Sequence, residues 1–180
     1  SYSAKIFDCE FFGFQESTTA AFKAAKNTYA DTLMFQNCYF HDISGQGIDL
    51  AAEKDDVGRY SAEYVLVDKC SFYKVLGTAV NLYRGGTDES TTGPRIDLYN
   101  STFTDVNNQE RGAVLRLLGV QVATIDNAKF FDSGRGGGSM RFDETPWDKI
   151  SVTNCQFVNS GKIQSFSGKI SNKNGLTLVD

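Results

Sequence analysis

Several features are scarce in this 180-residue chain, and each scarcity narrows what the protein can do. It has two prolines and one histidine, and its net charge of -4 is spread along the chain with both signs mixed. A mixed, weakly acidic charge argues against nucleic-acid binding, which uses a concentrated basic face. No apolar run approaches the roughly 18 residues of a membrane span. We therefore expect neither nucleic acid nor a membrane as a partner.

The single histidine also limits the catalytic chemistry. A Ser-His-Asp or Cys-His arrangement would need His41, which follows Phe40 near an expected turn. We expect this histidine to be satisfied by neighbours or exposed to solvent rather than to act as a base. The cysteines and the histidine lack zinc-ligand spacing, and no acidic stretch has the spacing of an EF-hand loop. The sequence thus predicts no catalytic residue and no metal site in this chain.

Aromatic residues are abundant, and many of them fall into a repeat. The chain has Phe 14 and Tyr 8, which with so few prolines favours strands and turns over helices. A four-residue unit with a small second residue and a fourth-position phenylalanine recurs at Asp8–Phe11, Asn37–Phe40, Lys69–Phe72, Asn100–Phe103, Asn127–Phe130 and Asn154–Phe157. From one small residue to the next the steps are 29, 32, 31, 27 and 27 residues. This near-constant spacing indicates a structural repeat.

Strand-like runs flank these units. One precedes each unit, at Lys5–Phe7, Thr32–Gln36, Tyr64–Asp68, Arg95–Tyr99, Ala123–Asp126 and Lys149–Thr153. Another follows most units after a few polar residues and a glycine, at Gly47–Ala51, Thr78–Tyr83, Ala113–Leu117, Ser139–Asp143 and Lys162–Phe166. A repeat of this length made of strands and turns predicts an all-β fold, a right-handed parallel β-helix of about six coils. We expect one such domain over residues 1–180.

Other repeat architectures fit less well. A helical repeat needs apolar residues at helical spacing, which only Ser17–Asn27 approaches. Its alanines and Ser/Thr start suit a short helix, and a side loop of one coil fits it equally. A propeller blade needs about 40–45 residues, and a leucine-rich repeat would show its Leu/Asn ladder.

The four cysteines fit the repeat better than they fit disulfides. Stacked coils would place the small residues of the unit in one inward ladder: Cys9, Cys38, Cys70, Ser101, Ala128 and Cys155. Side chains stacked one strand spacing apart rarely have disulfide geometry, and serine and alanine share the slot, so we expect reduced thiols. The asparagines Asn37, Asn100, Asn127 and Asn154 would form a second ladder at a turn that tolerates left-handed backbone.

Neither end of the sequence carries an amphipathic helix that would cap a solenoid. An uncapped last coil exposes apolar surface and unpaired strand edges. We therefore expect the 180 residues to be part of a longer β-helix protein, or to dock against another domain.

The stretch that departs most from the repeat is Leu82–Pro94, expected as a lateral loop between two strands. It contains Arg84, Asp88 and Glu89. The planar fork of the arginine suits bidentate contact with a carboxylate, so these charges can pair within the loop. The same groups can instead bind a substrate or dock a partner, and we keep them as candidates for that role.

Arginines recur in the second strand-like run of successive coils. Arg84, Arg116 and Arg141 lie in or just after that run in three coils, so they could align on one face. Such a face would suit an acidic polysaccharide. An ordinary outer ladder of charges paired with nearby acidic residues is the alternative.

The repeat and this loop together carry a resemblance. Asn-Cys-x-Phe coils combined with Leu82–Pro94, Leu-Tyr-Arg-Gly-Gly-Thr-Asp-Glu-Ser-Thr-Thr-Gly-Pro, resemble the C-terminal β-helix part of the polysaccharide lyase family that contains alginate lyases and chondroitinase B. The Arg-Gly-Gly-x-Asp-Glu-Ser-Thr block is the more specific signal, because many β-helices share the coil signature. The resemblance covers most of the chain but only the second half of a full-length family member.

The resemblance implies β-elimination on uronic-acid polysaccharides such as alginate or chondroitin/dermatan sulfate. In the family a calcium ion neutralises the uronate carboxylate, a lysine abstracts the C5 proton and an arginine assists the leaving group. That set belongs to the N-terminal catalytic β-helix domain, and no matching Glu/Lys/Arg cluster is found here, so no catalytic residue is carried over. The expectation is a non-catalytic domain that supports or extends the substrate groove of a secreted or periplasmic lyase.

Two alternatives come from other functional classes. One is a stand-alone carbohydrate-binding or adhesion β-helix. The other is a pectinase-type glycoside hydrolase, which needs opposed carboxylates such as Asp49 and Asp88. The adjacent pairs Asp55/Asp56, Asp88/Glu89 and Asp143/Glu144 are otherwise expected as solvated turn charges.

Overall fold

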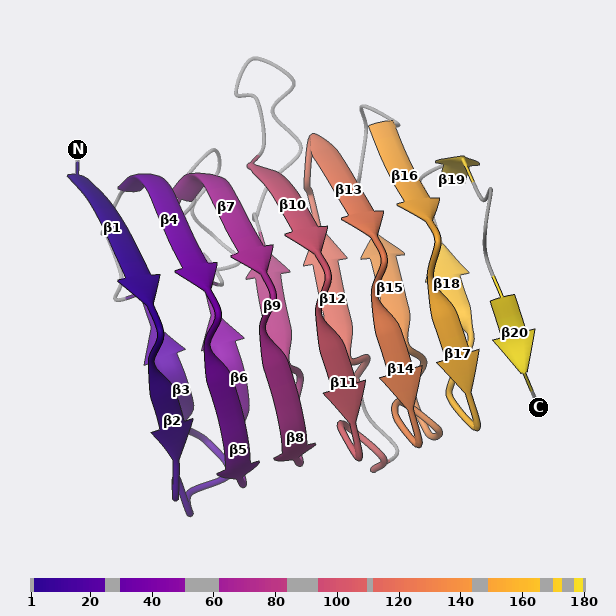
Figure 1. Cartoon of the computed structure of the whole chain (residues 1–180), viewed down its shortest axis with the longest axis horizontal. Coiled ribbons are helices and arrows are strands. Elements are labelled where there is room, and N and C mark those ends of the chain that lie inside the picture. Colours follow the sequence, from indigo (N-terminus) through magenta and orange to yellow (C-terminus); the bar gives the residue numbers. More distant parts are fainter. Residues whose placement is uncertain are drawn as a thin grey trace.

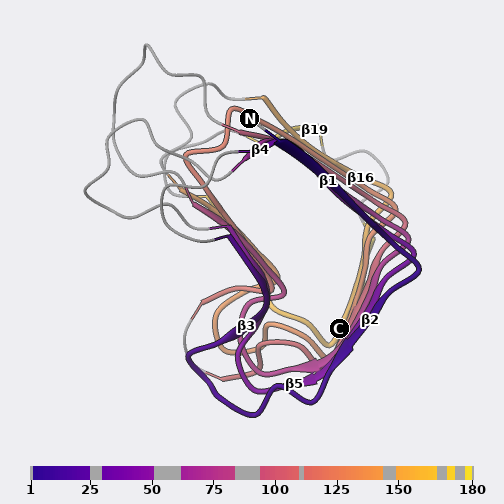
Figure 2. The same ribbon diagram turned by 90° about the vertical axis from the view of Figure 1, so that its left-hand side faces the viewer.

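The computed structural model describes residues 2–24, 30–50, 62–83, 94–109, 112–143, 149–165, 170–172 and 177–179. Over these residues the chain winds repeatedly through three parallel sheets, which we name A, B and C (Figure 1). Seen end-on, the coils superpose and the sheets surround a common core (Figure 2). The predicted all-β parallel β-helix is therefore confirmed. Within these residues no helix has the length and apolar character of a membrane span.

Each of the first six coils contributes one strand to each sheet, and one further strand extends each of sheets A and B. Sheet A contains β1 (Tyr2–Phe7), β4 (Ala30–Gln36), β7 (Ala62–Asp68), β10 (Arg95–Tyr99), β13 (Val122–Asp126), β16 (Lys149–Thr153) and β19 (Ile170–Asn172). Sheet B contains β2 (Glu10–Phe12), β5 (Tyr39–Ile43), β8 (Ser71–Val75), β11 (Thr102–Thr104), β14 (Lys129–Phe131), β17 (Gln156–Val158) and β20 (Thr177–Val179). Sheet C contains β3 (Ala20–Lys23), β6 (Gln46–Asp49), β9 (Val80–Tyr83), β12 (Leu115–Leu118), β15 (Met140–Asp143) and β18 (Ile163–Ser165). The described sheets thus hold seven, seven and six strands, slightly different from six uniform coils.

The phenylalanines of the repeat form a continuous stack inside the coils. Rings from successive strands of sheet B lie nearly parallel, with centroids 4.6 to 5.0 Å apart: Phe11, Phe40, Phe72, Phe103, Phe130 and Phe157. The rings stack because strands in register place equivalent side chains one strand spacing apart. Each ring in the middle of the stack contacts two others, which fixes the register of the coils.

The small residues line the predicted inward ladder. Cys38, Cys70 and Cys155 are buried, as are Ser101 and Ala128 in the same slot. All four cysteines of the chain are free thiols, as expected. Cys9 departs from the pattern because it is exposed in the first coil.

A left-handed residue links each of the first six strands of sheet A to the next strand of sheet B. The predicted asparagines Asn37, Asn100, Asn127 and Asn154 have φ of 55°, 51°, 53° and 52°. Asparagine is favoured there because its short polar side chain tolerates this backbone and bonds locally. The side chains also connect coils, since Asn127 Nδ2 donates to Asn100 Oδ1 at 2.8 Å.

The short helix considered for Ser17–Asn27 is wrong where the structure describes it. Ala20–Lys23 is strand β3, which pairs in parallel with β6. Pairing with sheet C outweighs the weak helix preference of the two alanines, because a strand here satisfies backbone groups of the neighbouring coil.

Candidate functional site

A row of polar side chains crosses the outer face of sheet C. Its members occupy equivalent positions on five successive strands: Lys23, Asp49, Asn81, Arg116 and Arg141. We call these five residues the polar row. Because parallel strands pair residue by residue, the row runs along the axis of the β-helix, one side chain per coil.

Strand alternation explains why these residues face outward. On β12 the neighbours of Arg116, Leu115 and Leu117, are completely buried in the core, whereas the arginine is partly exposed. The same alternation on β9 buries Val80 and Leu82 on either side of Asn81. Successive residues of a strand point to opposite faces, so the polar residue between two core residues must point out.

The first three members of the polar row bond to one another. Asn81 Nδ2 donates to Asp49 Oδ1 at 2.9 Å, and Lys23 Nζ lies 3.9 Å from Asp49 Oδ2. Asp49 and Asn81 are only 8% and 4% exposed although they face outward. These two partners satisfy the polar atoms of a largely buried carboxylate. Asp49 is thus engaged with an amide and a cation, and Asp88, its partner in the hydrolase alternative, lies outside the described residues.

The other end of the row is cationic. Arg116 Nη1 donates to Asn81 Oδ1 at 3.4 Å, which links the guanidinium to the buried pair. Arg116 and Arg141 are directly in register on β12 and β15 and are both partly exposed. Two arginines in register on adjacent strands bring two positive charges to one face of sheet C, which favours an anion at this part of the row.

The structure therefore brings together two of the five predicted binding residues, Arg116 and Arg141. Arg84, Asp88 and Glu89 lie outside the described residues, so their predicted role stays a prediction. The adjacent pairs Asp55/Asp56 and Asp88/Glu89 also lie outside them, as does Glu144.

A cluster on the outer face of sheet A was not predicted. Asp97 is 3% exposed and accepts hydrogen bonds from Arg95 Nη2 at 2.8 Å and from the Tyr64 hydroxyl at 3.0 Å. Burial and this hydrogen bond to Asp97 raise the pKa of Tyr64 to about 12. The signal in the sequence is an Arg-x-Asp pair on one strand face, with a tyrosine one repeat earlier in register with the arginine. The cluster neutralises its own charge, so we assign it a structural role.

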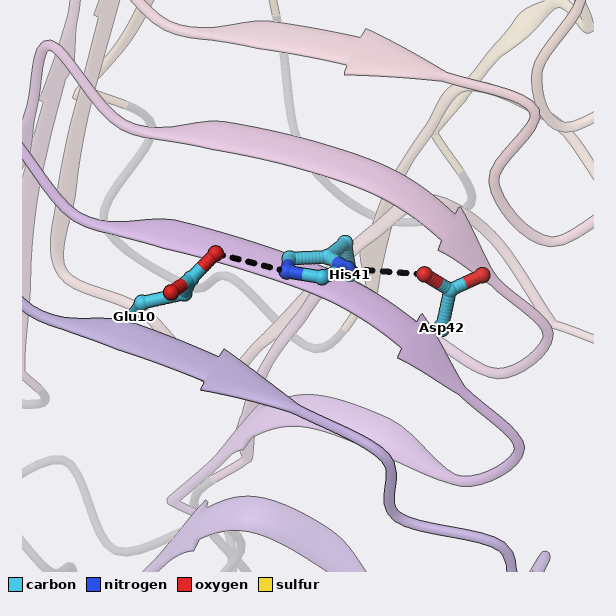
Figure 3. A network of polar contacts seen from close by, with 3 residues as sticks. All are labelled: Glu10, His41 and Asp42. Atoms are coloured by element: carbon cyan, nitrogen blue, oxygen red, sulfur yellow. Dashed lines mark hydrogen bonds and ion pairs between the residues drawn. The ribbon is translucent and has the colours of Figure 1, made fainter.

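His41 on β5 is satisfied by neighbours, as expected. Its two ring nitrogens lie within hydrogen-bond distance of Glu10 and Asp42 (Figure 3). The sequence did not predict these partners, because Glu10 comes from the preceding coil. Among the described residues, no three His, Cys, Asp or Glu side chains gather where they could hold a metal ion.

A scan against protein-family models and a search of curated proteins each found no match to this chain.

Proposed function

We propose that this chain is a carbohydrate-binding β-helix domain that holds an acidic polysaccharide along the polar row. The observation that carries the proposal is the in-register pair Arg116 and Arg141, partly exposed on adjacent strands. Guanidinium groups bind carboxylates and sulfates through paired N–H donors, and the fixed planar fork adds orientation to charge.

The spacing of the polar row suits a polymer. Neighbouring strands lie about 4.8 Å apart, close to the length of one sugar residue. A chain of uronic acids running along the β-helix axis would therefore meet one row residue per sugar. Arg116 and Arg141 would take consecutive acidic groups of such a chain.

The resemblance to the lyase family containing alginate lyases and chondroitinase B extends this proposal. In that setting the chain is the C-terminal, non-catalytic domain of a secreted or periplasmic polysaccharide lyase. It extends the substrate groove of an N-terminal catalytic β-helix domain. β-Elimination and the calcium ion belong to that catalytic domain, and Arg84, Asp88 and Glu89 are proposed to help the polar row bind substrate or to dock the catalytic domain.

Binding measurements with matched variants test the proposal. Calorimetry with alginate and with chondroitin and dermatan sulfates should show binding that weakens with salt, because surface charges are screened. The double variant Arg116→Gln/Arg141→Gln should bind about tenfold or more weakly, since it loses two charge-assisted contacts. Lys129→Gln is the control, because it removes one positive charge from an exposed position on sheet B. Equal affinity of the wild type and the double variant would contradict the proposal.

The non-catalytic assignment has a separate test. The 180-residue protein is incubated with the same polymers and calcium while the absorbance of the unsaturated product is followed. We expect no product, and calcium-dependent turnover would overturn this part of the proposal without touching the binding site.

A stand-alone carbohydrate-binding or adhesion protein is the second candidate. It is favoured by exposed aromatic rings on the outer face of sheet B, where Phe12 and Tyr39 are 60% and 37% exposed. Aromatic faces stack on the apolar faces of neutral sugars. Micromolar binding to neutral glycans, unaffected by Arg116→Gln/Arg141→Gln and lost in Tyr39→Ala, would support this candidate over the first.

A further inference from the structure

One cluster outside the polar row joins the first coil to the second through a titratable group. His41 Nε2 lies 2.9 Å from Glu10 Oε1 on β2, and His41 Nδ1 lies 2.7 Å from Asp42 Oδ2 (Figure 3). Ionised carboxylates only accept hydrogen bonds, and a neutral imidazole has a single N–H to donate. Both contacts can therefore be hydrogen bonds at the same time only when the ring carries two protons.

The ring is held in place by aromatic neighbours. It stacks on Phe12 at a centroid distance of 5.3 Å and on Tyr39 at 4.3 Å. The His41 side chain is 17% exposed, so its contacts are partly shielded from water while the ring can still exchange protons with solvent. This packing keeps the two nitrogens aimed at their partners, because the ring cannot turn without breaking a stack.

Neighbouring charges favour the protonated ring. Hydrogen bonds to Asp42 and then to Glu10 raise the pKa of His41 above its ordinary value, against an opposing effect of burial. From the other side, β8 contributes Tyr73, in register with His41, and Lys74, whose Nζ lies 5.0 Å from the Tyr73 ring centroid.

Among the described residues, the remaining strands packed against β5 add no charge to this cluster. They are β3 and β6. Their ionisable residues, Lys23 and Asp49, pair with each other in the polar row on sheet C. The two carboxylates are thus the groups that decide the proton affinity of the ring.

Glu10 lies on β2, so its contact with His41 connects the first coil to the second. In the described part of sheet B, β2 is a terminal strand of three residues, and β5 is its neighbour. We propose that His41 is a pH-dependent link between coils, which we call the clamp. In the clamp the doubly protonated ring donates one hydrogen bond to Glu10 of the first coil and one to Asp42 of the second. When the ring releases one proton to solvent, one carboxylate loses its hydrogen-bond donor, and that hydrogen bond is lost.

Glu10 is the partner that is released. Asp42 is adjacent to His41 in sequence and makes the shorter contact, whereas Glu10 belongs to another coil; the two carboxylate side chains are similarly exposed, at 56% for Asp42 and 58% for Glu10. A group whose pKa is higher in the folded state stabilises that state fully below its unfolded pKa of about 6.5. The stabilisation is then lost as the pH rises through the raised folded pKa. The first coil should therefore be held tightly in acid and loosen towards alkaline pH.

The titration of His41 is directly measurable, because it is the only histidine in the chain. Nuclear magnetic resonance of histidine-labelled protein should give one titration curve, with a midpoint above about 6.5. The midpoint should fall in Glu10→Gln and in Asp42→Asn, and most in the double variant. A wild-type midpoint at or below the ordinary value, or one unchanged in Glu10→Gln, would overturn the clamp.

Hydrogen exchange tests whether the protonation of His41 changes how tightly the first coil is held to the second. The Tyr39 amide donates to the Cys9 carbonyl at 2.9 Å, and the Ser71 amide makes the equivalent bond to Cys38, also at 2.9 Å, one coil further on. From about pH 5.5 to about pH 8, Tyr39 protection corrected for intrinsic exchange should fall about two- to fivefold, and Ser71 protection should stay constant. Glu10→Gln should remove the pH dependence at Tyr39. Equal behaviour of the two amides in the wild type would contradict a coil-specific clamp, even if His41 titrates as expected.

Discussion

The first and second coils carry the same residue pattern and have different burial. Phe11 and Phe40 are paired in register, as the repeat requires, but the first is partly exposed and the second is completely buried. Cys9 is exposed, whereas Cys38 is 2% exposed. The repeat thus determines which residue faces the core, and a neighbouring coil on each side determines how much of it is removed from water.

The difference in burial between the two coils should also be a difference in how much each phenylalanine stabilises the fold. Phe72 lies between Phe40 at 4.7 Å and Phe103 at 5.0 Å, whereas Phe11 stacks on Phe40 alone among the described rings. An interior ring therefore combines full burial with two stacking contacts, and each such contact contributes about 0.5–1.5 kcal/mol beyond burial.

The largest expected effect is the loss of an interior ring. Phe72→Ala should lower the free energy of unfolding by about 3–5 kcal/mol, because it removes apolar burial and leaves a cavity. Phe11→Ala should cost less than half as much, since that ring is already partly in water. Chemical denaturation followed by circular dichroism measures both. Equal losses would mean that the first coil is as well packed as the interior.

A smaller effect is expected at the left-handed turns. Asn100→Ala should cost about 1–2 kcal/mol, because φ of 51° strains an alanine and the side-chain bond to Asp68 is lost. Asn100→Gly is the control, because glycine adopts this backbone freely and loses only the side-chain hydrogen bonds to Asp68 and Asn127.

Replacing the equivalent left-handed residue of the first coil by alanine compares the stability of the first coil with that of an interior coil. Asp8 has φ of 54°, so Asp8→Ala introduces the same strain at the edge. We expect a smaller change in global unfolding there, because an edge coil can open locally before the rest unfolds. If Asp8→Ala and Asn100→Ala cost the same in chemical denaturation, the edge coil unfolds together with the interior.

Much of this fold could be predicted because the residues that determine it lie within a single repeat. The small residue and phenylalanine of each unit set the core ladder, and the preceding asparagine sets the turn. The alignment of Arg116 with Arg141 was predicted from their places in the second strand-like run of successive coils. In each case the residue type at one position indicates whether that residue is buried in the core, placed in a turn or exposed on a strand face.

Other features depend on contacts between coils or on less uniform positions. A second left-handed site at the end of the first six sheet B strands uses Gly13, Asp42, Lys74, Asp105, Asp132 and Asn159, a mixture that gives no clear ladder in the sequence. β3 was open to a helical interpretation because its pairing with β6 cannot be seen in its own residues. The partnership of His41 with Glu10 needed the register between strands 31 residues apart.

The difference between the coils is tested most directly by the reactivity of the four thiols. Burial raises the pKa of Cys70 to about 12 and that of Cys155 to about 11, and it also raises that of Cys38, so these groups form little thiolate near neutral pH. We predict that a thiol reagent modifies Cys9 rapidly in the folded 180-residue protein, and the other three cysteines only after unfolding. Modification of Cys38 at the rate of Cys9 would contradict it, because the second coil would then be no better covered than the first.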